Sequence, residues 1–444
     1  MTINNIILSI FSLLIFILPI PGTIALRNVL AVSLLLILFI IFITDKNHKS
    51  LFRFKEFYKI LNPLIALTLF ILFHCIFVST ETALSLSEFK SHWVYPMLYF
   101  VIGSLITFHI FKFSSFSRDV LINALFFTLL LHILYLDYFS TKFFLQEFTI
   151  KRSGGLLQSP ASANYISNIL ASIISVEVLY RLRFKDRVLK VSNLFLYLIS
   201  LIVLFSYLFE GVRFGYICLF LIGIEFIFFY YLNNRKITFK KKLLSILIFI
   251  LIFVLPLGAS IKFDDRWSSI IKTIPLAMET ETNLYWQNSH NKDIVPRFES
   301  GHISSESNYL RLAWIFKGVE YIRLNPMGIG YSRNAFGRAI EMYEGNNEAS
   351  GYHSHSSIID FTIGIGIIGT LIWLFFIYRL INIAYKKASK YYDYYALLTI
   401  LLISIFFIRS IIDSNMRDHI FQNLMLILGI TFSLMLYGKE HKNS

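Results

Sequence analysis

The chain of 444 residues is 56% hydrophobic and only 15% charged, and its mean hydropathy is +0.65. Soluble domains carry about 25% charged residues, so this composition excludes an ordinary soluble protein and indicates an integral membrane protein. The formal net charge of +14 does not indicate a nucleic-acid partner, because Lys and Arg fall in short clusters between apolar runs instead of along one polar face.

The chain is a succession of apolar runs, and a helix needs about 20 such residues to cross a bilayer. The first run lacks a small-residue cleavage site and is followed at once by another, so we interpret it as a retained span, not a signal peptide. We predict an all-α polytopic membrane protein with about 12 transmembrane helices. The runs lie at about residues 5–20, 24–44, 63–79, 92–111, 120–137, 163–180, 191–209, 213–232, 243–261, 357–380, 394–411 and 419–437.

Basic residues concentrate in every second connection between these runs. Positively charged connections stay in the cytoplasm, which places both termini inside and the long polar segment 262–356 outside. In a bacterium this topology predicts a multi-pass inner-membrane protein with segment 262–356 in the periplasm. The basic connections are residues 46–59, 112–118, 181–190, 235–242 and 379–390, together with the C-terminal tail.

We therefore divide the chain into three parts. Residues 1–261 form a bundle of about nine spans, and residues 357–444 add about three spans and a cytoplasmic tail. Between them, residues 262–356 form one large periplasmic loop, which we expect to contain helices. Ser305 or Ser307 can cap such a helix, and Asn325-Pro326 ends it.

Arg311 is one cation on an otherwise apolar helical stripe with Ile315, Gly318 and Ile322. An external helix with this stripe would lie against the bundle and direct the guanidinium into it. The fixed charge and planar fork of arginine suit a phosphate or pyrophosphate ligand. An ion pair with a carboxylate of the loop explains the same pattern.

Three further arginines are candidates on the same side. Arg213 lies at the outer junction of two spans, where an ionisable residue is a functional candidate by default, although Glu210 could pair with it. Arg152 belongs to a basic, glycine-containing loop that can present N–H groups and charge to an anion. Arg409 near the eleventh span either binds substrate or pairs locally with Asp413.

His353 and His355 precede the tenth span, with Asp360 just inside it. A third metal ligand is not evident apart from Asp360, so we predict no metal site. A neutral imidazole can instead accept the proton of an attacking hydroxyl, because its pKa lies near working pH. The alternative is a solvent-exposed pair of histidines at the start of a helix. Glu225, deep in the eighth span, fits either a proton path or an inter-helix hydrogen bond.

The layout of the spans and several motifs resemble the bacterial O-antigen ligases, within a superfamily that includes O-antigen polymerases and protein O-oligosaccharyltransferases. Arg311, Ala313-Trp314 and the run Asn325-Pro326-Met327-Gly328-Ile329-Gly330 are similar to its Arg…Trp…Pro-x-Gly-x-Gly pattern. Residues 355–360 read His-Ser-Ser-Ile-Ile-Asp, with Gly366 and Gly369 at the expected distance. The superfamily usually has Asn at the position of Ser356. His353 gives the His-x-His form of enterobacterial ligases, and residues 151–155 match a basic ligase loop.

The resemblance implies a glycosyltransferase that moves O-antigen from undecaprenyl pyrophosphate to lipid A–core on the periplasmic face, without metal or other cofactor. Its partners would be these two lipid-linked substrates and the surrounding membrane lipids. Arg213, Arg311 and Arg152 would then stabilise the pyrophosphate, and His355 would be the base. His353 and Asp360 would orient His355 or bind acceptor sugar, and Arg409 would bind substrate.

Other functions stay open. A polymerase uses the same donor but a second lipid-linked glycan as acceptor, and a protein O-oligosaccharyltransferase transfers to protein. From a different class, a secondary transporter or lipid flippase would explain Glu225 and the arginines at membrane depth. Transporters often contain paired broken helices and internal repeats, and the sequence predicts neither.

Overall fold

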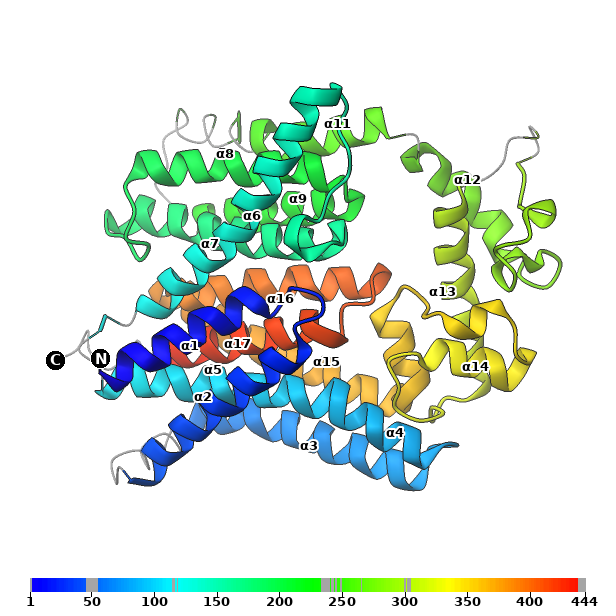
Figure 1. The fold of residues 1–444 in the computed structure, drawn as a ribbon, viewed down its shortest axis with the longest axis horizontal. Helices are drawn as coiled ribbons and strands as arrows, with labels where there is room; N and C mark the ends of the chain where they lie inside the picture. The colour runs from blue at the N-terminus through cyan, green and yellow to red at the C-terminus, as the bar shows by residue number, and fades with distance from the viewer. Residues whose placement is uncertain are drawn as a thin grey trace.

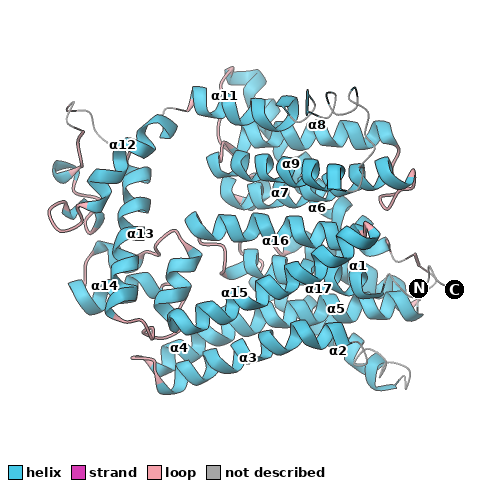
Figure 2. Ribbon diagram, turned by 180° about the vertical axis from the view of Figure 1, so that it is seen from behind, coloured by secondary structure: helices cyan, strands magenta, loops and turns pink. Residues whose placement is uncertain are grey.

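The structure, a computed structural model, describes residues 2–44, 55–113, 116–117, 119–232, 240, 243, 246–247, 250–264, 266–298, 301 and 305–437. In these ranges the chain folds into helices joined by loops (Figure 2). The start of α1 and the end of α17 lie at one end of the helix bundle, and α12–α14 lie at the opposite end (Figure 1). The chain is an all-α polytopic membrane protein.

Ten helices of the described part are long and apolar enough to cross a membrane. They match ten of the predicted apolar runs. One of these spans is composite, because α4 (Thr82–Phe89) and a π-helical turn, η2 (Lys90–Val94), lead without a break into α5 (Tyr95–Phe113). The other nine are α2 (Ile24–Thr44), α3 (Lys55–Phe77), α6 (Val120–Glu147), α7 (Pro160–Phe184), α8 (Asn193–Glu210), α9 (Arg213–Leu232), α15 (Ser357–Tyr391), α16 (Tyr394–Ile412) and α17 (Asp418–Tyr437).

Two of the predicted spans differ from these ten. The first, α1 (Ile3–Ile17), has 15 residues, which is about 22 Å of helix and less than the ~30 Å hydrocarbon core of a bilayer. The run at 243–261 lies partly outside the described residues. Its described end forms η4 (Ile250–Val254) and α11 (Leu255–Phe263).

The spans form two groups (Figure 1). One contains α6–α9 and α11, and the other contains α1–α5 and α15–α17. In the second group α17 packs along α5, and α15 packs against α3 and α16. Contacts of α16 with α7 and α9 join the two groups, so α16 lies where the groups meet.

Residues 264–356 leave the end of the bundle as a helical unit, which we call the α12–α14 region. It contains α12 (Arg266–Met278), η5 (Leu284–Trp286), η6 (Lys292–Ile294), α13 (Glu306–Leu324), α14 (Ala335–Glu344) and η7 (Glu348–Gly351). The prediction that this segment contains helices is confirmed, and α13 ends just before Asn325-Pro326. The region has its own aromatic core, made of Tyr285, Trp286, Tyr309, Trp314, Tyr321 and Phe336.

Helix α15 is interrupted at Gly366, whose φ of 75° is non-helical. The loop at residues 326–330 replaces the lost backbone hydrogen bonds. The N–H groups of Ile329 and Gly330 donate to the carbonyls of Ile363 (3.0 Å) and Gly364 (2.9 Å), and the N–H of Ile367 donates to Pro326 (2.9 Å). The sequence predicted no broken helix, and the structure corrects that prediction. The break is buried against protein, as it must be where no water can satisfy it.

Candidate active site

Arg213, the first residue of α9, reaches into the α12–α14 region. Its guanidinium donates to the Asn308 side-chain oxygen (2.9 Å) and to the Arg266 carbonyl (3.1 Å). The expected alternative partner, Glu210, lies elsewhere: it is fully buried and accepts a hydrogen bond from Asn164 (2.6 Å). The pairing of Arg213 with Glu210 is therefore wrong. The carboxylate near Arg213 belongs to Asp264, 4.0 Å away.

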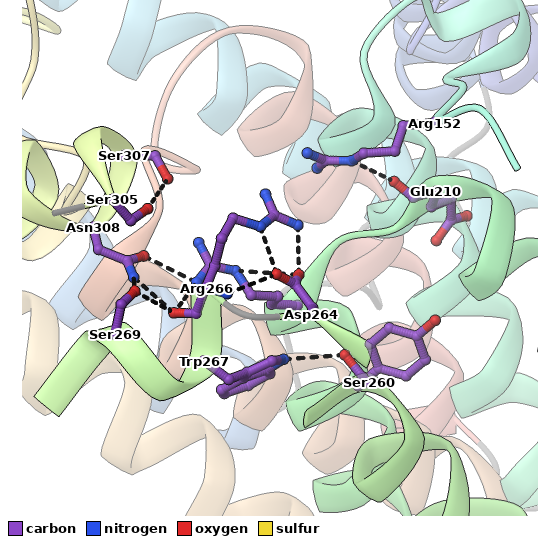
Figure 3. Close-up of polar contacts among 12 residues, drawn as sticks. Arg152, Glu210, Ser260, Asp264, Arg266, Trp267, Ser269, Ser305, Ser307 and Asn308 are labelled. Atoms are coloured by element: carbon purple, nitrogen blue, oxygen red, sulfur yellow. Dashed lines mark hydrogen bonds and ion pairs between the residues drawn. The ribbon is translucent and has the colours of Figure 1, made fainter. Parts of the chain in front are cut away.

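Asp264 and Arg266 form a two-point ion pair that the sequence analysis missed (Figure 3). Arg266 donates through Nε to one carboxylate oxygen (2.7 Å) and through Nη2 to the other (2.5 Å). These hydrogen bonds lower the pKa of the Asp264 carboxyl and raise that of Arg266. A signal was present, since both charges directly follow the ninth apolar run. In the sequence these two charges look like the start of a polar loop, and only the fold brings them to Arg213.

Arg152 approaches this group from the loop between α6 and α7. Its Nε donates to the Glu210 carbonyl at 3.4 Å (Figure 3). Partial burial and then the neighbouring cation Arg266 lower the pKa of Arg152. Arg311 contributes to the same effect, so the fold gathers arginines from four segments. Because neighbouring arginines lower the pKa of Arg152 and of Arg213, a multiply charged anion is favoured at this cluster.

Arg311 lies on α13 and is exposed. It has no hydrogen bond or ion pair with any residue that the structure describes, so none of the described loop carboxylates neutralises it. It lines a half-open pocket of about 650 Å³. Two arginines lie among mostly apolar walls, an arrangement that fits a lipid with an anionic head. The lining residues are Arg213, Phe214, Ile217, Trp267, Ile270, Asn308, Arg311, Leu312, Ile315 and Ile412.

His355 stacks on Trp314, which lies one helical turn from Arg311 on α13. The two ring centroids are 5.5 Å apart and the planes differ by 7°. His353 packs edge-on against His355, with 4.4 Å between centroids. Burial, then His353 and Arg311, lower the pKa of His355 to about 3. Burial and then Arg417 lower the pKa of His353 to about 4. Both imidazoles are therefore neutral at neutral pH.

Hydrogen bonds with the start of α15 fix the loop that carries the two histidines. The buried Asp360 carboxylate accepts a hydrogen bond from the Ser354 backbone N–H (3.2 Å). Ser356, at the position where the superfamily usually has Asn, is the N-cap of α15 and accepts from the Ile359 N–H (3.4 Å). A serine fills this capping role well. His355 itself has a left-handed backbone, with φ of 57°, which turns the ring toward Trp314.

Arg409 is fully buried on α16 and does not line the pocket. It donates to Asp413 (2.8 Å) and Asn164 (2.7 Å), and its guanidinium lies 3.6 Å from the centre of the Tyr165 ring. Burial alone would raise the pKa of Asp413, but Arg409 and then Arg311 and His355 hold it below its usual value. The Asp413 carbonyl accepts from the Ser357 N–H (3.1 Å), so this ion pair supports the start of α15.

Glu225 lies on α9, away from these groups; one of its carboxylate oxygens is buried without a hydrogen-bond partner in the described chain. Among the residues described, no group of three or more His, Cys, Asp or Glu side chains is arranged to hold a metal ion.

Comparison with known proteins gives one family. Residues 198–374 match the family model described as O-antigen ligase. The matched stretch contains Arg213, Arg311, His353, His355 and Asp360, whereas Arg152 and Arg409 lie outside it. No curated protein matches the chain.

Proposed function

Because residues 198–374 carry a domain of the O-antigen ligase/polymerase superfamily, we propose that this membrane protein is an O-antigen ligase. It would transfer O-antigen from undecaprenyl pyrophosphate to the lipid A–core oligosaccharide in lipopolysaccharide biosynthesis. It would lie in the bacterial inner membrane, with residues 262–356 and the active site on the periplasmic face. The alternation of basic connections supports this orientation.

The observation that carries the proposal is the position of Arg311. A cation without a partner among the described residues faces an apolar-walled pocket, and one helical turn along the same helix Trp314 stacks on a neutral imidazole. The apolar walls suit the first isoprene units of the donor, and Arg311, Arg213 and Arg152 suit its pyrophosphate. We add Arg266 to this group, since Asp264 holds it beside Arg213.

In the transfer step the acceptor hydroxyl oxygen forms a bond to the anomeric carbon of the donor sugar. The bond from that carbon to the pyrophosphate oxygen breaks, and the leaving pyrophosphate keeps the electron pair. The arginines stabilise the charge that develops there, and the hydroxyl proton passes to His355. The donor's negative charge opposes the cations that lower the pKa of His355, so donor binding makes this imidazole a stronger base.

Of the remaining predicted site residues, two would act through other residues and one would contact substrate. Asp360 is buried and holds Ser354, between the two histidines, so we assign it to positioning the loop. Arg409 is buried and would act through Asp413 instead of touching substrate. His353 is half-buried beside His355 and would contact the acceptor sugar.

The test is a lipopolysaccharide gel of a deletion strain complemented with wild type, His355→Ala or Arg311→Ala. For a ligase, the deletion strain lacks the O-antigen ladder and accumulates long lipid-linked chains, and only wild type restores the ladder. A polymerase would instead leave lipopolysaccharide capped with a single repeat. An unchanged ladder would overturn both functions and would favour a transporter.

A further inference from the structure

A second, polar pocket of about 300 Å³ lies beside the histidine loop and shares no lining residue with the first. Three segments enclose it: the chain after Gly330, the start of α15 and the connection between α16 and α17. Its polar lining residues are Ser332, Arg333, Ser357, Asp360, Ser414 and Arg417. We call it the Arg333–Arg417 pocket.

This pocket and the histidines are parts of one hydrogen-bonded unit. Asp360 lines the pocket and binds the backbone N–H of Ser354, between the two histidines. Ser357, two residues after His355, also lines the pocket and accepts a hydrogen bond from the Met416 N–H (2.9 Å). A ligand in the pocket is therefore held at a fixed place relative to both imidazoles.

The histidine loop has a link to each pocket: His355 stacks on Trp314, three residues after Arg311 of the first pocket, and Asp360 of the second pocket binds the Ser354 N–H. Among the charged side chains nearby, Arg311 of the first pocket lowers the pKa of His355 most. For His353 the corresponding residue is Arg417 of the Arg333–Arg417 pocket.

The charges of the second pocket are balanced, unlike those around Arg311. Arg417 donates to Asp418 (3.3 Å), and Arg333 lies 3.6 Å from Asp418 and 3.9 Å from Glu88. The Ser414 hydroxyl is buried and has no hydrogen-bond partner in the described chain. Paired guanidinium and carboxylate groups beside the Ser414 hydroxyl offer donors and acceptors together. This chemistry suits the hydroxyl groups of a sugar better than a pyrophosphate.

We propose that the Arg333–Arg417 pocket is the acceptor subsite, which binds the hydroxyl-rich terminal sugar of the acceptor glycan. The sugar lies against Arg333, Arg417 and Ser414 and directs its reacting hydroxyl past His353 to His355. The inference rests on the proposed glycosyl transfer, because only a two-substrate reaction needs a second site beside the base. The acceptor glycan comes either from a core oligosaccharide or from a second lipid-linked repeat.

The test uses the purified full-length protein in detergent with lipid-linked donor and acceptor glycolipid. For Arg333→Ala and Arg417→Ala we expect the KM for acceptor to rise roughly ten- to hundredfold, as for the loss of a charged hydrogen bond, and the KM for donor to stay within about twofold. Arg323→Ala, which removes an exposed arginine from α13, is the matched control and should change neither. Supplying the core glycolipid and the lipid-linked repeat separately identifies the acceptor source.

Ser414→Ala tests the same pocket if the arginine variants fail to fold, because it removes one hydroxyl and no charge. It should raise the KM for acceptor severalfold at an unchanged unfolding temperature. An unchanged acceptor KM in folded variants, or a rise in donor KM alone, overturns the acceptor subsite. If wild type forms no product with either acceptor, the proposed function itself has failed.

Discussion

The imidazole of His355 lies parallel to the indole of Trp314, with 5.5 Å between ring centroids and 7° between planes. Trp314 is itself fixed, because its Nε1–H donates to the Trp286 carbonyl (3.0 Å) and its other neighbours include Tyr352 (5.5 Å). Arg311 precedes Trp314 by three residues on α13. One helix therefore sets both the position of the Arg311 cation and the orientation of the His355 imidazole.

Trp314→Leu should lower kcat about tenfold or more while changing the KM for donor less, because His355 loses its stacking partner, a contact of about 0.5–1.5 kcal/mol. Trp314→Phe keeps an aromatic face and should retain more activity. Steady-state kinetics of folded protein check this. Equal activity of the Leu and Phe variants would show that stacking does not position the base.

Arg311→Ala should reduce kcat by about 10²–10³, the range found when one donor to a developing anion is removed. Arg311→Lys keeps the charge but loses the planar fork, so we expect an intermediate rate. Arg323→Ala, at an exposed position near the end of the same helix, should leave the rate unchanged. A rate for Arg311→Ala close to that of Arg323→Ala would remove the pyrophosphate role.

The pH dependence follows from the low pKa of His355, about 3 against an ordinary 6.5. Neutral His355 is the active form, so the acid limb of kcat/KM for donor, which reports the free protein, should lie well below pH 6.5. The limb of kcat should lie at higher pH, because bound pyrophosphate raises the pKa. Coincident limbs near pH 6.5 would contradict a buried base.

The same shift affects stability. Between pH 6.5 and 3 the unfolded chain binds more protons at this position than the folded chain, since the folded pKa is the lower one. The contribution of His355 to the free energy of unfolding is therefore complete above about pH 6.5 and is lost as the pH falls. In His355→Gln this part of the pH dependence should disappear from thermal unfolding curves.

Asp264→Asn should strengthen binding of the product, undecaprenyl pyrophosphate, about three- to tenfold, because a carboxylate that competes for Arg266 and Arg213 is neutralised. Inhibition of turnover by added product measures this. The control is Glu348→Gln, which neutralises a carboxylate of η7 that pairs with His290. Weaker product inhibition in Asp264→Asn would mean that Asp264 mainly keeps Arg266 in place.

Gly366→Ala and Gly328→Ala should each destabilise the protein by at least about 1–2 kcal/mol, because both glycines have positive φ. In addition, a Cβ on either residue would collide with the backbone of the facing segment. Gly351→Ala, where a Cβ meets no atom within 4 Å, is the control. The unfolding temperature in detergent is the measurement. Equal values for the three variants would contradict the close backbone contact between Gly328 and Gly366.

Sequence patterns predicted the helical spans well, because apolar length is a local property. They also singled out Arg213, Arg311 and His355 as candidates, because these residues stand out from their neighbours. They missed Asp264 and Arg266, which look like ordinary loop charges until folding brings them to Arg213, 51 and 53 residues away along the chain. They also missed the break in α15, because the hydrogen bonds that permit it come from residues 326–330.

Residues 326–330 are hydrogen-bonded to the break at Gly366. The chain between these two segments therefore leaves the bundle and returns to the same place. Its two ends are anchored independently of what lies between them. The exposed turn at Gly345, where a side chain would meet no atom within 4 Å, is consequently a site for inserting an epitope or a fluorescent reporter. Such an insertion would lengthen a loop whose two ends are already held together. It should cost little stability, because the entropy of loop closure changes only slowly with loop length.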